Sequence, residues 1–313
     1  MTDTGDSTMP HAHERLPAWA VFPVAALLSW VIGALPWIVS GMRLEISDAW
    51  PDFLPGHTPR VALPFGEYAV QPLLTVGVIG GAAAMAASLL ARPSVRHPRV
   101  LAAAGASVGL LVALWQTVMV AGGSLADLRE ARLLVAGLIA TLVVASAIGM
   151  VAGAGLAAHR GLVWPLGGAL VASLAGPWFN DLVHRGVINP SWTNGVAKWN
   201  LWIGGVVLGL VLAAYGIQRT HLPVWLGALA VLWVMPAALI ALNYVTYYGT
   251  RNPIRRGTVS EVLDGGRDVF VKALEPHTHV IGPLILAAVI GVLGEVARSA
   301  RSTPALSADA PAA

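Results

Sequence analysis

The chain has 313 residues, of which 56% are hydrophobic and 11% are charged, and its mean hydropathy is +0.70. Soluble globular domains carry roughly 25% charged residues, so this composition excludes a soluble protein. It also excludes a disordered chain and a nucleic-acid-binding protein, because both need far more charge. The absence of cysteine excludes a disulfide scaffold, thiol catalysis and iron–sulfur clusters. We therefore predict an all-α polytopic membrane protein whose first partner is the lipid bilayer.

About 20 apolar residues are needed to cross a bilayer as a helix, and eight stretches of the chain meet this requirement. They are Ala18–Val39, Ala69–Ala91, Val100–Ala121, Leu133–Ala157, Leu162–Phe179, Asn200–Ile217, Leu222–Tyr247 and Val280–Val296. The first is too long for the apolar core of a signal peptide and lacks a clear cleavage site, so we expect it to be retained. We thus expect one transmembrane domain over residues 18–297, between a polar N-terminus at 1–17 and a disordered tail at 298–313.

The loop charges predict the orientation, since basic loops stay in the cytoplasm. The three shortest loops are Arg92–Arg99, Ala158–Gly161 and Gln218–His221, and they carry arginines but no acidic residue. We place these loops and both termini in the cytoplasm, and residues 40–68, 181–199 and 249–279 outside. The basic residues are almost all arginine, and Ala, Val and Gly are abundant, which is typical of a GC-rich bacterial genome. The predicted location is accordingly the plasma (inner) membrane.

A weak internal similarity runs through the second to seventh spans, which form three hairpins flanked by the first and last helices. Their basic turns are marked by Arg99, Arg160 and Arg219, at intervals of 61 and 59 residues. Three GxxxG pairs also lie in the spans, and such pairs let helix backbones approach closely. We expect them to pack helices within one chain, with homodimerisation as the alternative. The pairs are Gly105 with Gly109, Gly149 with Gly153, and Gly205 with Gly209.

Two segments outside the spans are expected to fold. The segment from Thr258 to Pro276 repeats apolar residues at a helical period, which predicts an amphipathic helix on the outer surface. Gly265 and Gly266 disfavour a helix interior, so two short helices are an alternative to one. The loop at 40–68 is rich in proline and aromatic residues and too apolar for a free linker, so we expect it to fold over the helix ends.

Charge inside a span is costly and usually functional, so its scarcity here is informative. We single out Gln116 and Asn243 as the strongly polar side chains within the spans, with Glu295 near the end of the last span. No carboxylate lies near a midplane, which disfavours a proton relay. No histidine lies in mid-span to bind haem, and no nucleotide-binding signature is present. Pro36, Pro177 and Pro236 are expected to kink their helices.

Ionisable residues gather instead in the expected outer segments. Asp181 and His184 are three residues apart and share a face if a helix continues through them. We propose Asp181, His184, Asp52 and Glu67 as candidate catalytic residues, able to act as acid or base. Histidine and carboxylate side chains also bind transition metals, and a second, metal-binding set is predicted. That set comprises Asp181, His184, His277, His279 and His57.

Three functions remain open at this stage. The span count, the kinked helices and the lack of a catalytic motif favour a transport or translocation component for a small apolar or amphiphilic cargo, with a polar vestibule on the outer side. The outer carboxylates and histidines suit an outer-face enzyme, with or without a metal, acting on a lipid-linked envelope substrate. A structural or assembly subunit, associating with further copies or with other membrane subunits, needs no site at all.

Overall fold

The computed structural model describes residues 15–44, 49–50, 58–127, 129–158, 161–186, 190–217, 219–251, 258–277 and 280–302. In this part of the chain the regular structure is helical, apart from two isolated β-bridges. The longer helices are α1 (Ala18–Gly33), α3 (Val70–Ala86), α4 (Pro98–Gly122), α5 (Arg129–Ala158), α6 (Val163–Gly186), α7 (Pro190–Tyr215), α8 (Leu222–Arg251), α9 (Thr258–Leu274) and α10 (Gly282–Ser302). Short helices are α2 (Leu35–Val39), η1 (Ala87–Leu89) and η2 (Arg219–His221).

Five of the helices are long and apolar enough to cross a membrane: they contain the segments Val70–Leu89, Pro98–Gly122, Ala131–Ala158, Leu222–Tyr248 and Gly282–Ala300. The apolar helices Ala18–Gly33 and Trp202–Tyr215 are shorter. Large apolar side chains such as Leu111, Leu210 and Leu226 are exposed along these helices, as a lipid-facing surface requires. A multi-pass helical membrane protein is therefore indicated, whereas the count of eight spans is not confirmed.

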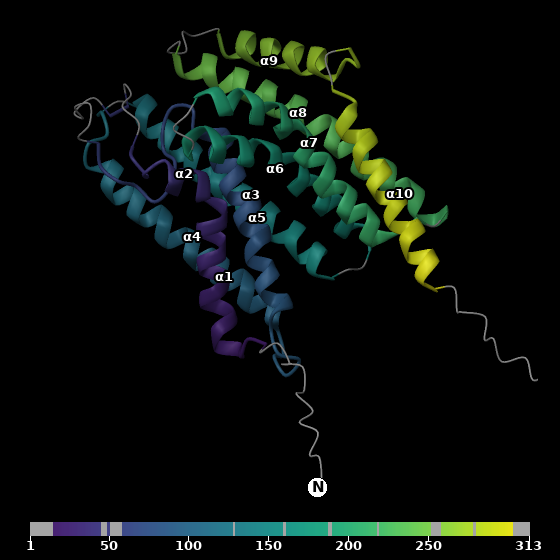
Figure 1. The fold of residues 1–313 in the computed structure, drawn as a ribbon. Helices are drawn as coiled ribbons and strands as arrows, with labels where there is room; N and C mark the ends of the chain where they lie inside the picture. The colour runs from purple at the N-terminus through teal and green to yellow at the C-terminus, as the bar shows by residue number, and fades with distance from the viewer. Residues whose placement is uncertain are drawn as a thin grey trace, which may run out of the picture.

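The N-terminal half packs through glycines. Helix α1 lies against α3 and α4, and α3 lies against α5 (Figure 1). A methyl group at Gly109 of α4 would lie 2.5 Å from the carbonyl oxygen of Ala26 in α1, and one at Gly153 of α5 would lie 2.7 Å from the Cα atom of Ala82 in α3. Both GxxxG pairs of this half therefore serve contacts within the chain, as predicted.

The C-terminal half is built around α7. This helix packs on α6 and α10 and makes few contacts with α8, so the last of the three predicted hairpins is not a closely packed pair. Its GxxxG pair faces α10, because a methyl group at Gly209 would lie 2.7 Å from Cβ of Ile290. The two halves meet where α6 contacts α5, α3 and α2. A small apolar cluster of Val78, Ala145, Leu174 and Leu239 fills that junction.

The first predicted span is divided between α1 and α2. The backbone leaves helical geometry at Ala34, with φ −92° and ψ 9°, two residues before Pro36. Proline has no N–H, so Pro36 cannot donate to the carbonyl of Ile32, four residues earlier. The indole N–H of Trp178 in α6 donates to that carbonyl at 3.0 Å. The expected kink at Pro36 is thus confirmed, and the hydrogen bond from Trp178 connects α6 to α1.

The described part of the loop at 40–68 folds over the helix ends, as predicted. Val61, Leu63 and Phe65 are almost completely buried there. The indole N–H of Trp37 donates to the carbonyl of Val61 at 2.9 Å, and the backbone N–H of Ala62 donates to Gln116 Oε1 at 2.7 Å. Gln116, a polar side chain within an apolar helix, therefore holds this loop in place.

The amphipathic segment is a single helix, α9, which lies along α8 at the end of the molecule opposite the start of α1 (Figure 1). Gly265 and Gly266 do not break it. They bring α9 close to α8, since a methyl group at Gly265 would lie 2.7 Å from the hydroxyl oxygen of Tyr244. The alternative of two short helices is wrong for that reason.

Helices also extend into segments that we expected to be loop or tail. Helix α6 continues to Gly186 and α7 begins at Pro190, so most of the expected loop at 181–199 is helical. Helix α10 continues to Ser302, beyond the expected start of a disordered tail at 298. Arg298 explains this extension, because its guanidinium donates to the carbonyls of Ala213 and Ala214 and pairs with Glu295. Arg298 thus satisfies carbonyls at the end of α7, and Glu295 accepts from the backbone N–H of Ile217, just beyond that end, at 3.2 Å.

Candidate functional site

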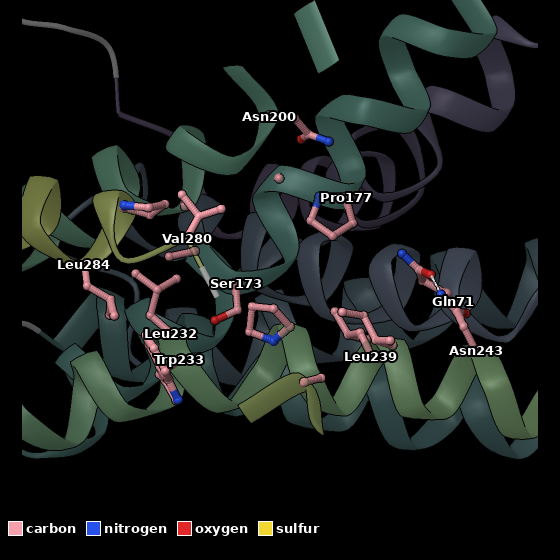
Figure 2. A pocket seen from close by; sticks show the side chains of 17 residues that line it. Gln71, Ser173, Pro177, Asn200, Leu232, Trp233, Leu239, Asn243, Val280 and Leu284 are labelled. Atoms are coloured by element: carbon pink, nitrogen blue, oxygen red, sulfur yellow. Dashed lines mark hydrogen bonds between the residues drawn. The ribbon is translucent and has the colours of Figure 1, made fainter. Parts of the chain in front are cut away.

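A cavity of about 400 Å³ lies among α6, α7, α8 and α10, with α3 and α9 contributing one residue each. Most of its surface is apolar: Leu232, Trp233, Leu239, Ile240, Val280 and Leu284 line it. Four polar side chains also line it, namely Gln71, Ser173, Asn200 and Asn243. In Figure 2, Gln71 and Asn243 lie at one end of the cavity and Leu284, Leu232 and Trp233 at the other. The site is thus an apolar space with polar groups at defined places.

Two prolines within helices border this space. Pro177 lies inside α6 and Pro236 lies inside α8, and both line the cavity. Each proline withholds a backbone N–H from the carbonyl four residues earlier, and these carbonyls belong to two further lining residues, Ser173 and Leu232. Two backbone acceptors at the cavity therefore lack their usual helical donors.

Glycines bring α6 and α7 together beside the cavity. A methyl group at Gly176 would lie 2.9 Å from the backbone oxygen of Asn200, and one at Gly204 would lie 2.9 Å from the carbonyl oxygen of Ala172. Larger residues at these positions would push the two helices apart. The part of α7 that carries Asn200 is therefore held against α6 at the wall of the cavity.

The polar side chains of the cavity differ in what they bind. The hydroxyl of Ser173, which is almost fully buried, donates to the carbonyl of Ala169 at 2.8 Å. The amide of Asn243 in α8 donates to Gln71 Oε1 in α3, which links the two halves of the molecule. Oδ1 of Asn200 is buried and has no hydrogen-bond partner among the described residues. An unpaired buried acceptor costs roughly 1–3 kcal/mol, so this oxygen is the lining acceptor that would gain most from a donor.

A second, more polar space adjoins the first and shares Gln71 and Asn243 with it. This vestibule has a volume of about 310 Å³ and is also lined by Tyr68, Pro72, Asp181, Thr246 and Tyr247. The rings of Tyr68 and Tyr247 are stacked, with centroids 5.6 Å apart and planes inclined by 30°. The amide pair of Gln71 and Asn243 thus stands at the boundary between an apolar cavity and a polar vestibule.

Asp181 reaches the vestibule because α6 continues past its apolar part. Three residues earlier, the indole of Trp178 is anchored on the carbonyl of Ile32 at 3.0 Å. Positions three apart lie on one side of a helix, so the contact that fixes Trp178 also fixes the side of α6 that carries Asp181. Both residues line a small gap against Pro36 and Trp37 of α2.

The other predicted site residues do not gather around Asp181 in the described part of the chain. His184 is exposed, and its Nδ1 lies 3.0 Å from the carbonyl oxygen of Asn180. His277 is exposed and lies 3.2 Å from a carboxylate oxygen of Glu275. Glu67 is half-buried just before α3. Asp52, His57 and His279 lie outside the described residues.

The metal site stays a prediction. Among the residues that the structure describes, no three histidine or acidic side chains come close enough together to hold a metal ion. The described members of the predicted set, Asp181, His184 and His277, therefore form no metal centre among themselves. Any such centre needs ligands from the remaining segments, to which His57 and His279 belong.

Two residues of the cavity were not singled out from the sequence. Gln71 lies near the start of the second predicted span, and Asn200 lies at the first position of the sixth. A count of every amide within the predicted spans would have found both. Asn243 was singled out, and the structure places it at the boundary of cavity and vestibule.

Comparisons with known proteins give no further guide to the site. No protein-family model, no curated protein and no solved structure matches this chain.

Proposed function

We propose that the protein is a transport or translocation component that carries a small amphiphilic, lipid-like molecule across the plasma membrane. The observation that supports this most is the pairing of an apolar cavity of about 400 Å³ with a polar vestibule of about 310 Å³. Ligand sites in proteins span roughly 300–1,000 Å³ and combine mostly apolar walls with a few convergent polar groups. The shared boundary at Gln71 and Asn243 lets one molecule occupy both spaces.

The arrangement suits a molecule with one alkyl chain and one polar head group. The chain would lie against Leu232, Leu239 and Ile240, and the head group would stay in the vestibule. Lipid tails are as apolar as these side chains, so moving a chain from the bilayer into the cavity gains little free energy. Selection of the cargo therefore rests on the head group, and the cavity provides a path that keeps the chain away from water.

Two tryptophan substitutions on α9 test whether the cavity is the binding site. Ala273 lines the cavity, whereas Val271, two residues away on the same helix, is 52% exposed and does not line it. Ala273→Trp should fill the space and weaken dodecanol binding, measured by native mass spectrometry, by about tenfold or more, which corresponds to ~1.4 kcal/mol. Val271→Trp is the matched control and should bind as the wild type does. Equal binding by both variants would contradict the proposal.

Transport itself is tested in vesicles. Proteoliposomes carrying an NBD-labelled dodecyl chain in both leaflets are treated with dithionite, which bleaches only the outer leaflet. The wild type should accelerate loss of the inner-leaflet signal over protein-free vesicles, and Ala273→Trp should remove that acceleration while Val271→Trp keeps it. If amphiphiles bind but no exchange is seen, carriage is refuted.

One observation favours a second candidate, an outer-face enzyme acting on a lipid-linked substrate. Asp181 is a carboxylate in a polar space beside an apolar cavity, a placement that suits an acid or base acting on the head group of a bound amphiphile. This candidate predicts that incubation with a bacterial lipid extract changes the mass of a bound lipid, and that Asp181→Asn prevents the change. If the masses of bound lipids do not change and leaflet exchange is observed, the enzyme is refuted and the carrier stands.

A further inference from the structure

The vestibule combines one acidic side chain with a cluster of tyrosines. Asp181 is the one charged side chain among the described residues that line the vestibule, and no described residue of the adjoining cavity is charged. A cleft lined by charge of one sign concentrates molecules of the opposite sign, and this effect is strongest beside low-dielectric walls. The charge of Asp181 therefore favours a cation over a carboxylate, sulfate or phosphate group beside it.

The aromatic lining points to the same charge. Tyr68 and Tyr247 stack in the wall of the vestibule, and both are 40% exposed. Tyr248 extends the cluster, with its ring centroid 5.4 Å from that of Tyr247, and Tyr244 lies 4.5 Å from Tyr248. The faces of aromatic rings attract cations, and proteins hold quaternary ammonium groups against several such faces.

These groups converge from three parts of the chain. Tyr68 precedes α3, Asp181 lies near the end of α6, and Tyr247 lies near the end of α8. They meet on the vestibule side of the boundary formed by Gln71 and Asn243, whereas the alkyl-chain space lies on the other side. A molecule whose alkyl chain enters the cavity would thus place its head group in the vestibule, beside Asp181 and the tyrosines.

We propose that the vestibule is a recognition site for an ammonium head group, so that the cargo is a single-chain amphiphile with a positive charge. Asp181 supplies the opposite charge, and Tyr68 and Tyr247 supply the aromatic faces. This inference rests on the proposed function, because it specifies the head group of the molecule whose chain occupies the cavity.

The test compares molecules with the same chain and different head groups: dodecyltrimethylammonium, dodecanol and dodecyl sulfate. Affinity is measured by calorimetry on the full-length protein in lipid nanodiscs. The ammonium compound should bind about tenfold more tightly than dodecanol, and dodecyl sulfate should bind most weakly. Asp181→Asn should reduce binding of the ammonium compound by about fivefold or more and leave dodecanol binding unchanged.

Two matched comparisons separate recognition from folding. Asp264, an exposed acid on α9 that does not line the vestibule, is the control for charge, and Asp264→Asn should bind as the wild type does. Tyr68→Phe keeps the ring face and should retain most of the ammonium preference, whereas Tyr68→Leu should reduce it by about threefold. Retained dodecanol binding shows that each variant is folded.

The outcomes distinguish this inference from the proposed function. If dodecanol and the ammonium compound bind equally, or if Asp181→Asn changes neither, the ammonium site is refuted and the amphiphile carrier stands. If dodecyl sulfate binds most tightly, the charge argument is refuted. If the wild type binds none of the three, both the proposed function and this inference are refuted.

Discussion

The contact between Trp178 and Ile32 allows a quantitative test of how α6 is positioned. Pro36 withholds the N–H that would normally satisfy the carbonyl of Ile32, and the indole of Trp178 donates to it instead, at 3.0 Å. Replacing Trp178 by phenylalanine removes the donor and leaves the carbonyl without a partner. Replacing Pro36 by alanine restores a backbone N–H that can satisfy the carbonyl from within a continuous helix.

The expected magnitudes follow from the half-buried setting of this bond. A neutral buried acceptor left unpaired costs about 1–3 kcal/mol, and hydrogen bonds between membrane helices average ~0.6 kcal/mol with values up to ~1.7. We expect Trp178→Phe to lower the free energy of unfolding by about 1–2 kcal/mol in the wild type. In the Pro36→Ala background the destabilisation caused by Trp178→Phe should be smaller by about 1 kcal/mol, because the N–H of the new alanine can satisfy the carbonyl of Ile32. The cost of replacing indole by a smaller ring is the same in both backgrounds and cancels in the cycle.

The four proteins of this cycle are unfolded reversibly in mixed micelles by increasing the fraction of dodecyl sulfate, and helicity is followed by far-ultraviolet circular dichroism. The coupling energy is obtained from the four unfolding free energies. A coupling near zero, with Trp178→Phe equally costly in both backgrounds, would refute the idea that Trp178 replaces the donor lost at Pro36.

The same unfolding assay checks two further predictions. Gly109→Ala should destabilise the protein by about 1–3 kcal/mol, because its methyl group would lie 2.5 Å from the carbonyl oxygen of Ala26. Gly137→Ala, in open space on α5, is the control and should be neutral or stabilise by up to ~1 kcal/mol. Equal effects of the two substitutions would contradict the close contact of α1 and α4. Asn200→Leu should stabilise the ligand-free protein by about 1 kcal/mol, because it removes a buried oxygen with no partner among the described residues, and a destabilised variant would show that this oxygen is satisfied.

The packing of neighbouring helices could be predicted from the sequence because its signals are local. A GxxxG pair places two glycines on one helix face, so each pair marks a close contact wherever its partner lies, as Gly109 does on α1 and Gly209 on α10. The fold of the loop at 40–68 was predictable for a similar reason. Its apolar residues had to be buried, and Val61 and Leu63 are.

The candidate site could not be predicted in the same way, because it depends on which distant segments meet. Tyr68, Asp181 and Tyr247 line one space, yet no local pattern connects three residues so far apart in the chain. Asp181 was singled out for its charge, whereas its partners were not, because a tyrosine at the end of a span is equally typical of an ordinary aromatic belt. The grouping of Asp181 with distant histidines rested on residue type and on their place in the expected outer segments, and neither determines which segments meet.

The three-hairpin interpretation shows a second limit. Equal spacing of Arg99, Arg160 and Arg219 describes turns along the chain but does not determine which helices pack together. Helix α7 packs on α6 and α10, because Gly205 and Gly209 present a flat face to α10. The contact of α7 with α8 is correspondingly small, and the cavity lies among α6, α7, α8 and α10.

Photolabelling tests the central claim, that the cavity holds the chain of an amphiphile. Dodecylamine carrying a diazirine at the end of its chain is irradiated with the protein in proteoliposomes, and the labelled peptides are identified by mass spectrometry. Label should appear on Leu232, Leu239 or Ile240 of α8, which line the cavity, and unlabelled dodecylamine should compete for it. Label confined to lipid-facing residues such as Leu210 and Leu226, without competition, would contradict the account.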